Sequence, residues 1–180
     1  MYTPRRTKTE ELLANLIREL FQTETSGLRH CRREADRLGS VEPAQAMRAI
    51  ADHARAALKG LPSLCEREGM PVSVVRSLTG SLFSELRDKL ADGLIQSERS
   101  YRGTLLGTRH GLDLVHMVEL TADGASRVAL VSFCQAWRTT RTVLVERAEE
   151  AMRWFALNPE KASRLARPLL LRFRAKELHA

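Results

Sequence analysis

Apolar residues recur every three or four positions along most of this chain, the spacing that places them on one face of an α-helix. Ala, Leu, Arg and Glu are plentiful, whereas aromatic residues make up only 5% of the 180 residues. This composition also favours helices. The sequence therefore predicts an all-α fold. The long helical stretches cover about residues 7–38, 43–65, 94–120 and 125–156.

Local signals mark the ends of the first two long helices. Thr7 and Glu10 have the spacing of an N-terminal capping box, and Gly39 is a typical residue just after a helix end. Pro43 suits the first turn of the second helix. Pro62 is expected to kink or end that helix, because proline removes a backbone donor.

The breaks further along the chain predict the connections. Residues 72–90 have helical spacing and predict a shorter helix between the second and third long helices. Residues 121–124 read as a turn before the fourth long helix. Short loops make consecutive long helices antiparallel. Residues 1–156 are expected to form the bundle with a short basic N-terminal arm, and residues 157–180 a basic, Leu-rich helical tail.

The net charge of +7 is concentrated at the two ends of the chain. Residues 9–156 carry 20 basic and 20 acidic side chains, so the body is balanced. Basic ends can contact nucleic-acid phosphates, anionic lipid or an acidic partner, and they can equally be solvated. The basic residues that could make such contacts are Arg5, Arg6, Lys8, Arg164, Arg167, Arg172, Arg174 and Lys176, and the ends also carry Lys161.

The remaining bulk features predict a cytoplasmic protein without a membrane span. The longest uncharged apolar run, about residues 128–137, is too short to cross a bilayer, and the N-terminus lacks the apolar region of a secretory signal. Cys31, Cys65 and Cys134 lie far apart among helical apolar positions. We therefore expect them to be buried, reduced thiols.

Sequence motifs give no support for catalysis. Nucleophile elbows, phosphate-binding loops, zinc-ligand spacings and dinucleotide fingerprints are absent from the sequence. We predict no catalytic residue and no cofactor. Gly103, Gly107 and Gly111 recur every four residues and predict a face for close helix packing.

Two acidic residues interrupt the apolar faces of the helices. Glu24 falls on the apolar face of the first long helix, and Glu98 on that of the third. A buried carboxylate is costly unless it is paired and hydrogen-bonded. Cations and hydroxyls near the apolar faces can supply those partners. We predict a buried polar network of Glu24, Glu98, Tyr101, Arg138 and Arg141.

Residues 90–106, LADGLIQSERSYRGTLL, resemble the third bundle helix of small bacterial ferritin-like stress proteins. Those helices also pair an inward Glu with a Tyr three or four positions on. The resemblance implies an up-down four-helix bundle of ferritin-like topology, in which a crossover segment reaches the third helix.

The same resemblance implies a set of metal ligands that this chain carries only in part. Glu24, His53 and Glu98 match ligand positions of the first three helices. Ile50 stands where the second helix of the family has the Glu of its Glu-x-x-His pair. The corresponding region of the fourth helix, residues 134–138, holds no ligand pair. Glu24, His53 and Glu98 therefore remain as an alternative, smaller metal site.

Three functional hypotheses follow. The leading one is a non-catalytic bacterial helical-bundle protein that acts through a protein partner or as a homodimer, which would bury the apolar cluster at residues 169–173. The second is a metal-binding ferritin-like protein. The third is binding of nucleic acid or an anionic surface through the basic ends.

Overall fold

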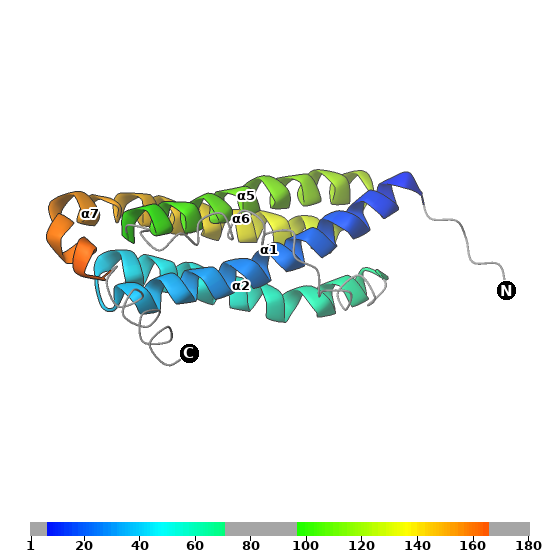
Figure 1. Cartoon of the computed structure of the whole chain (residues 1–180). Coiled ribbons are helices and arrows are strands. Elements are labelled where there is room, and N and C mark those ends of the chain that lie inside the picture. Colours follow the sequence, from blue (N-terminus) through cyan, green and yellow to red (C-terminus); the bar gives the residue numbers. More distant parts are fainter. Residues whose placement is uncertain (1–6, 71–96, 166–180) are drawn as a thin grey trace, which may run out of the picture.

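The computed structural model describes residues 7–70 and 97–165, and all regular structure within these ranges is helical (Figure 1). The predicted all-α class is confirmed. The helix predicted over residues 72–90, the cluster at residues 169–173 and most basic residues of the ends lie outside the described residues. The helices are α1 (Lys8–Leu38), α2 (Glu42–Arg67), α5 (Ser97–Gly124), α6 (Val128–Glu150) and the short α7 (Arg153–Leu157).

The predicted ends of α1 are confirmed. The Thr7 hydroxyl accepts a hydrogen bond from the Glu10 amide at 3.2 Å, and Glu10 Oε2 accepts one from the Thr7 amide at 2.9 Å. At the other end, Gly39 has φ of 77° and its amide donates to the carbonyl of Ala35. A positive φ of this size strains most residues other than glycine, so Gly39 ends the helix.

Two predicted helix ends were wrong. Helix α2 continues through Pro62 to Arg67, and α5 runs to Gly124 without a turn at residues 121–124. Both segments bury apolar side chains in the core, which offsets the weak local propensity for helix. The side chains buried there are Leu61, Leu64, Cys65 and Ala122.

The four long helices pack in neighbouring pairs, with α1 against α2 and α5, and α6 against α5 and α2. Helices α1 and α5 run in opposite directions, since Glu34 bonds Ser100 whereas Glu19 lies beside His110. Short loops make α1 and α2 antiparallel. Helices α2 and α5 therefore run in the same direction, and Figure 1 shows that α5 begins at the end of the bundle opposite to the end of α2.

The core consists of two apolar clusters at different levels of the bundle. One cluster includes Leu13, Ile17 and Leu61, and the other includes Leu38, Met47, Ile50 and further residues of every long helix. The gap between the clusters falls near the middle of each long helix. Polar residues lie in that gap, and they form the candidate site.

The three cysteines are free and buried, as predicted. Burial raises the pKa of Cys31 and Cys134 to about 12, so neither thiol is activated at neutral pH. Among the helices of residues 7–70 and 97–165, none is long and apolar enough to cross a membrane.

Candidate functional site: a buried polar centre

Side chains of α1, α2 and α6 meet between the two apolar clusters. Helix α1 contributes Glu24, α2 contributes His53, and α6 contributes both Trp137 and Arg141. Helix α5 contributes Gly111, which leaves room for the others. Helical spacing of four residues puts Trp137 and Arg141 on the same inward face of α6.

The strongest contact of this centre is an ion pair between α1 and α6. Arg141 Nη2 lies 2.7 Å from Glu24 Oε2, and each side chain is only 2% exposed. Burial raises the pKa of the Glu24 carboxyl, and the nearby positive charge of Arg141 opposes that rise. Because arginine stays protonated in proteins, the guanidinium supplies the charge that a buried carboxylate needs.

The same guanidinium also bonds His53. Arg141 Nε donates a hydrogen bond to His53 Nδ1 at 3.0 Å, which requires Nδ1 to carry no proton. The imidazole is therefore neutral, with its proton on Nε2. Burial and, to a smaller extent, the positive charge of Arg141 together lower the pKa of His53 to about 4. His53 thus acts as an acceptor that fixes the orientation of Arg141.

Trp137 closes one side of the centre. The guanidinium carbon of Arg141 lies 4.6 Å from the centroid of the indole, in a cation–π contact. The His53 ring lies 5.4 Å from the same indole. A Cβ at Gly111 would be 3.5 Å from Trp137 Cη2, so the indole lies directly against the backbone of α5.

The predicted glycine packing face is therefore found only at Gly111. Gly103 and Gly107 have no atom within 4 Å of an added Cβ, and Gly103 is exposed. The prediction failed for these two residues because a spacing of four drifts around the helix. Two such steps, from Gly103 to Gly111, move from the outside of α5 toward the core.

The placement of Glu98 in the buried network was wrong. Glu98 is about one-third exposed and lies 3.8 Å from Arg102 on the same helix. The inward face of α5 passes through Ser97 instead, four residues before the buried Tyr101. A step of three residues back from Tyr101 gives Glu98 and a step of four gives Ser97. The sequence pattern allowed either residue on the inward face, and the packing of the helices places the smaller one, Ser97, there.

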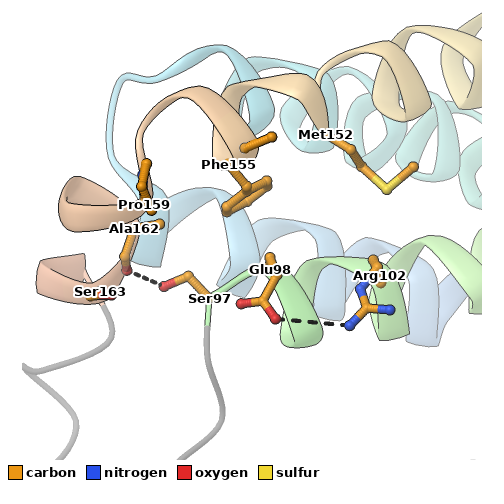
Figure 2. Close-up of a pocket in the computed structure, with 9 residues that line it drawn as sticks. Ser97, Glu98, Arg102, Met152, Phe155, Pro159, Ala162 and Ser163 are labelled. Carbon is orange, nitrogen blue, oxygen red and sulfur yellow. Dashed lines mark hydrogen bonds and ion pairs between the residues drawn. The ribbon is translucent and has the colours of Figure 1, made fainter.

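Glu98 instead borders an apolar hollow of about 420 Å³ at the end of the bundle (Figure 2). The ion pair with Arg102 is marked in the same view. The two side chains lie at the side of the hollow formed by α5. Helix α7 and the helical residues 159–165 form the other side. The apolar residues that line it are Met152, Phe155, Ala156, Pro159 and Ala162.

The other two predicted members of the network also lie outside the centre. Arg138 is 38% exposed and its Nη1 lies 2.6 Å from Glu119 Oε2, because one residue beyond Trp137 points about 100° away. Tyr101 is buried, and its hydroxyl donates to the carbonyl of Ala148 at 2.9 Å. Of the five predicted residues, the structure brings only Glu24 and Arg141 together.

A second polar cluster, which the sequence analysis missed, lies near the start of α5. Arg37 Nη1 donates to Ser97 Oγ at 2.6 Å, and Arg37 also pairs with the buried Glu34. Ser100 Oγ donates to Glu34 Oε2 at 2.8 Å. Ser97 Oγ donates to the carbonyl of Ala162 at 2.8 Å. The spacing of Glu34 and Arg37 reads as a surface pair, and no sequence signal placed the serines beside them.

The geometry does not favour the predicted metal ligands as a set. Glu24 and His53 both accept hydrogen bonds from Arg141, and Glu98 lies elsewhere. Ser97, the neighbour of Glu98, bonds Arg37, which is about 20 Å along α1 from Glu24. Within residues 7–70 and 97–165, no three His, Cys, Asp or Glu side chains form a group that could hold a metal ion.

The described part of the basic ends consists of exposed side chains. Lys8 is exposed in the first turn of α1. Arg164 is 74% exposed and lies 3.8 Å from Glu160. Binding of nucleic acid through the ends stays a prediction, because Arg5, Arg6, Arg167, Arg172, Arg174 and Lys176 lie outside the described residues.

Comparisons of the chain with protein-family models, with curated proteins and with solved structures gave no match. The assignment of this chain therefore depends on its own geometry.

Proposed function

We propose that this chain is a metal-free helical scaffold of ferritin-like topology that acts through contacts with protein surfaces, including its own. The observation that carries this proposal is the position of Arg141. Its guanidinium bonds both Glu24 and His53, the two candidate ligands that lie in the centre of the bundle. In the proposed ferritin-like arrangement, this protein cation would occupy the position at which metal-binding bundles of that class hold metal ions.

Electrostatics supports the proposal. A metal ion bound to Glu24 would lie within about 4 Å of a permanent positive charge, and the repulsion from each unit of its charge would be about 4 kcal/mol at an effective dielectric of about 20. His53 would also have to give up its bond to Arg141 before its Nδ1 could bind a metal. The hydrogen bonds of the centre therefore favour a closed, structural role.

The directions of the helices support the ferritin-like part of the proposal. Bundles of that class have one long connection that crosses the length of the bundle between helices running in the same direction. Here α2 and α5 run in the same direction, and residues 71–96 connect them. Self-association and a cytoplasmic location stay predictions that accompany this proposal.

Metal analysis of the full chain, purified without chelator, tests the proposal. We expect far less than one equivalent of iron, manganese or zinc, and no gain in thermal stability when each metal is added. Glu24→Ala tests the candidate ligand, and Glu119→Ala is the control because Glu119 pairs with Arg138 outside the centre. Stoichiometric metal that is lost in Glu24→Ala and retained in Glu119→Ala would overturn the proposal.

A further inference from the structure

The outward face of α5 carries a regular seam of exposed residues. Successive members are three and four residues apart in strict alternation, from position 103 to position 124. This average spacing of 3.5 residues is the heptad pattern of two helices that wrap around each other. The seven members, all exposed, are Gly103, Leu106, His110, Asp113, Met117, Leu120 and Gly124.

The apolar members of the seam are large and openly exposed. Leu106 is 60% exposed, Met117 is 46% exposed and Leu120 is 55% exposed. They lie on the side of α5 opposite to the residues that pack into the core. A second heptad face of this kind is not needed to hold α5 in its own bundle. The seam spans about 32 Å of helix, or three heptads.

The seam is complementary to itself in one antiparallel register. When two copies of α5 are paired about a two-fold axis between Gly111 and Leu112, Leu106 comes opposite Met117 of the second copy. Leu120 comes opposite Gly103, where an added Cβ would meet no atom within 4 Å. Space at the glycine is thus matched by a large side chain, as knobs-into-holes packing requires.

The polar members of the seam also fit this two-fold axis. In this register His110, whose Nε2 lies 3.6 Å from Glu19 Oε1 of its own chain, also comes opposite Asp113 of the second copy. The pair occurs twice because of the two-fold axis. A parallel arrangement would instead put Asp113 opposite Asp113, which like charges disfavour. On one flank of the seam, Arg102 also comes close to Asp123 of the second copy. Charge therefore selects the antiparallel register that the apolar residues also favour.

We propose that two copies of this chain associate through the outward faces of α5, as a two-fold antiparallel helix pair with Leu106 opposite Met117 and His110 opposite Asp113. The proposal rests on the proposed function, because it names the protein surface and the partner through which the scaffold acts. The two-fold match favours a second copy over an unrelated partner, since binding of an unrelated partner would not require the seam to match itself.

Light scattering and sedimentation of the full chain test the dimer. The 20.3 kDa chain should have twice its own mass at high concentration. His110→Asp should raise the dimer dissociation constant about tenfold or more, because it places two acids opposite each other. The exchange variant His110→Asp/Asp113→His should restore dimerisation. Val143→Asp is the control, since Val143 is 45% exposed on α6, away from the seam.

Oxidative cross-linking tests the register. The variant Leu106→Cys/Met117→Cys should form a disulfide-linked dimer, whereas Leu106→Cys alone should not. Two copies of position 106 would be about 16 Å apart along the pair. The three native cysteines are buried and therefore do not compete. The variants replace exposed side chains, and circular dichroism checks that they fold.

A full chain that stays monomeric at its highest soluble concentration would overturn the proposed dimer. Equal cross-linking by the single and double cysteine variants would also overturn it. So would an exchange variant that fails to restore association. Stable capture of a different protein on the seam, with no dimer, would also overturn it. A metal-free monomer would leave the proposed scaffold standing. A dimer that holds stoichiometric metal would overturn the proposed function and leave the dimer in place.

Discussion

Two glutamate–arginine pairs stabilise different parts of this bundle. Glu24 and Arg141 are separated by 117 residues in the sequence and join α1 to α6 through the core. Glu34 and Arg37 lie one turn apart on α1 and reach α5 through Ser97. The first pair is a tertiary contact, whereas the second is a local pair to which tertiary contacts have been added.

The difference in surroundings determines what each pair can tolerate. The side chains of Glu24 and Arg141 are each 2% exposed, so water cannot replace a lost partner. Arg37 is 12% exposed, and its contacts include both the hydroxyl and the carbonyl of Ser97. Removing one contact there leaves others in place. The central pair should therefore be much more sensitive to substitution than the pair at the end of the bundle.

The largest expected effect comes from Arg141→Met. It leaves the Glu24 carboxylate buried without a cation, and we expect the free energy of unfolding to fall by about 3–5 kcal/mol. Urea denaturation followed by circular dichroism measures this loss. Arg138→Met on the same helix is the matched control and should cost less than about 1 kcal/mol, because Arg138 is 38% exposed.

A second substitution sharpens this result. Adding Glu24→Gln to Arg141→Met removes the orphaned charge and should recover much of the lost stability. If Arg141→Met cost no more than Arg138→Met, the central pair would not be what neutralises the buried carboxylate.

The second-largest expected effect is that the free energy of unfolding depends on pH through His53. Its pKa of about 4 in the folded chain lies below the ordinary value of 6.5, so the unfolded chain takes up the proton first as the pH falls. The stability is therefore fully present above about pH 6.5 and is lost as the pH falls toward 4, by about 1–2 kcal/mol once screening at the partly exposed ring is included. Denaturation of the chain and of His53→Gln at several pH values measures the difference.

The comparison with His53→Gln is needed because Glu24 changes the stability in the opposite direction as the pH falls. The raised pKa of Glu24 makes the folded chain take up a proton first as the pH falls, which favours the folded state. Glu24 is common to both proteins, so the difference between their curves isolates His53. Parallel curves between pH 4 and 6.5 would contradict the predicted role of His53 as a neutral acceptor.

The smallest effect is expected for Ser97→Ala at the end of the bundle. This change removes the hydroxyl bonds to Arg37 and to the carbonyl of Ala162, and it should cost about 1–2 kcal/mol. Amide hydrogen exchange at residues 159–165 should become faster, because Ser97 ties that segment to α5. Ser132→Ala is the control, since Ser132 is exposed and its hydroxyl donates to the carbonyl of Val128 on the same helix. Unchanged exchange would show that Ser97 does not hold this segment.

Local signals in the sequence predicted much of the fold. The capping box at Thr7 and Glu10 and the glycine at position 39 gave the ends of α1 correctly. These signals act between residues within one turn, so they can be read without knowledge of the partner helices. The helix ends expected at Pro62 and at residues 121–124 were wrong, because burial of the neighbouring turns outweighed the local preference.

The sequence by itself determined that the chain is helical, where α1 begins and ends, and that Glu24 faces the core. The tertiary structure alone decided that Arg141 rather than Arg138 meets Glu24, and that Ser97 rather than Glu98 faces inward. Counting along a helix in steps of three or four residues identifies the inward face only to within one residue. Neighbouring residues point about 100° apart around the helix. Only the packing of one helix against another selects between those two positions, and at this site that selection determines which charges are buried.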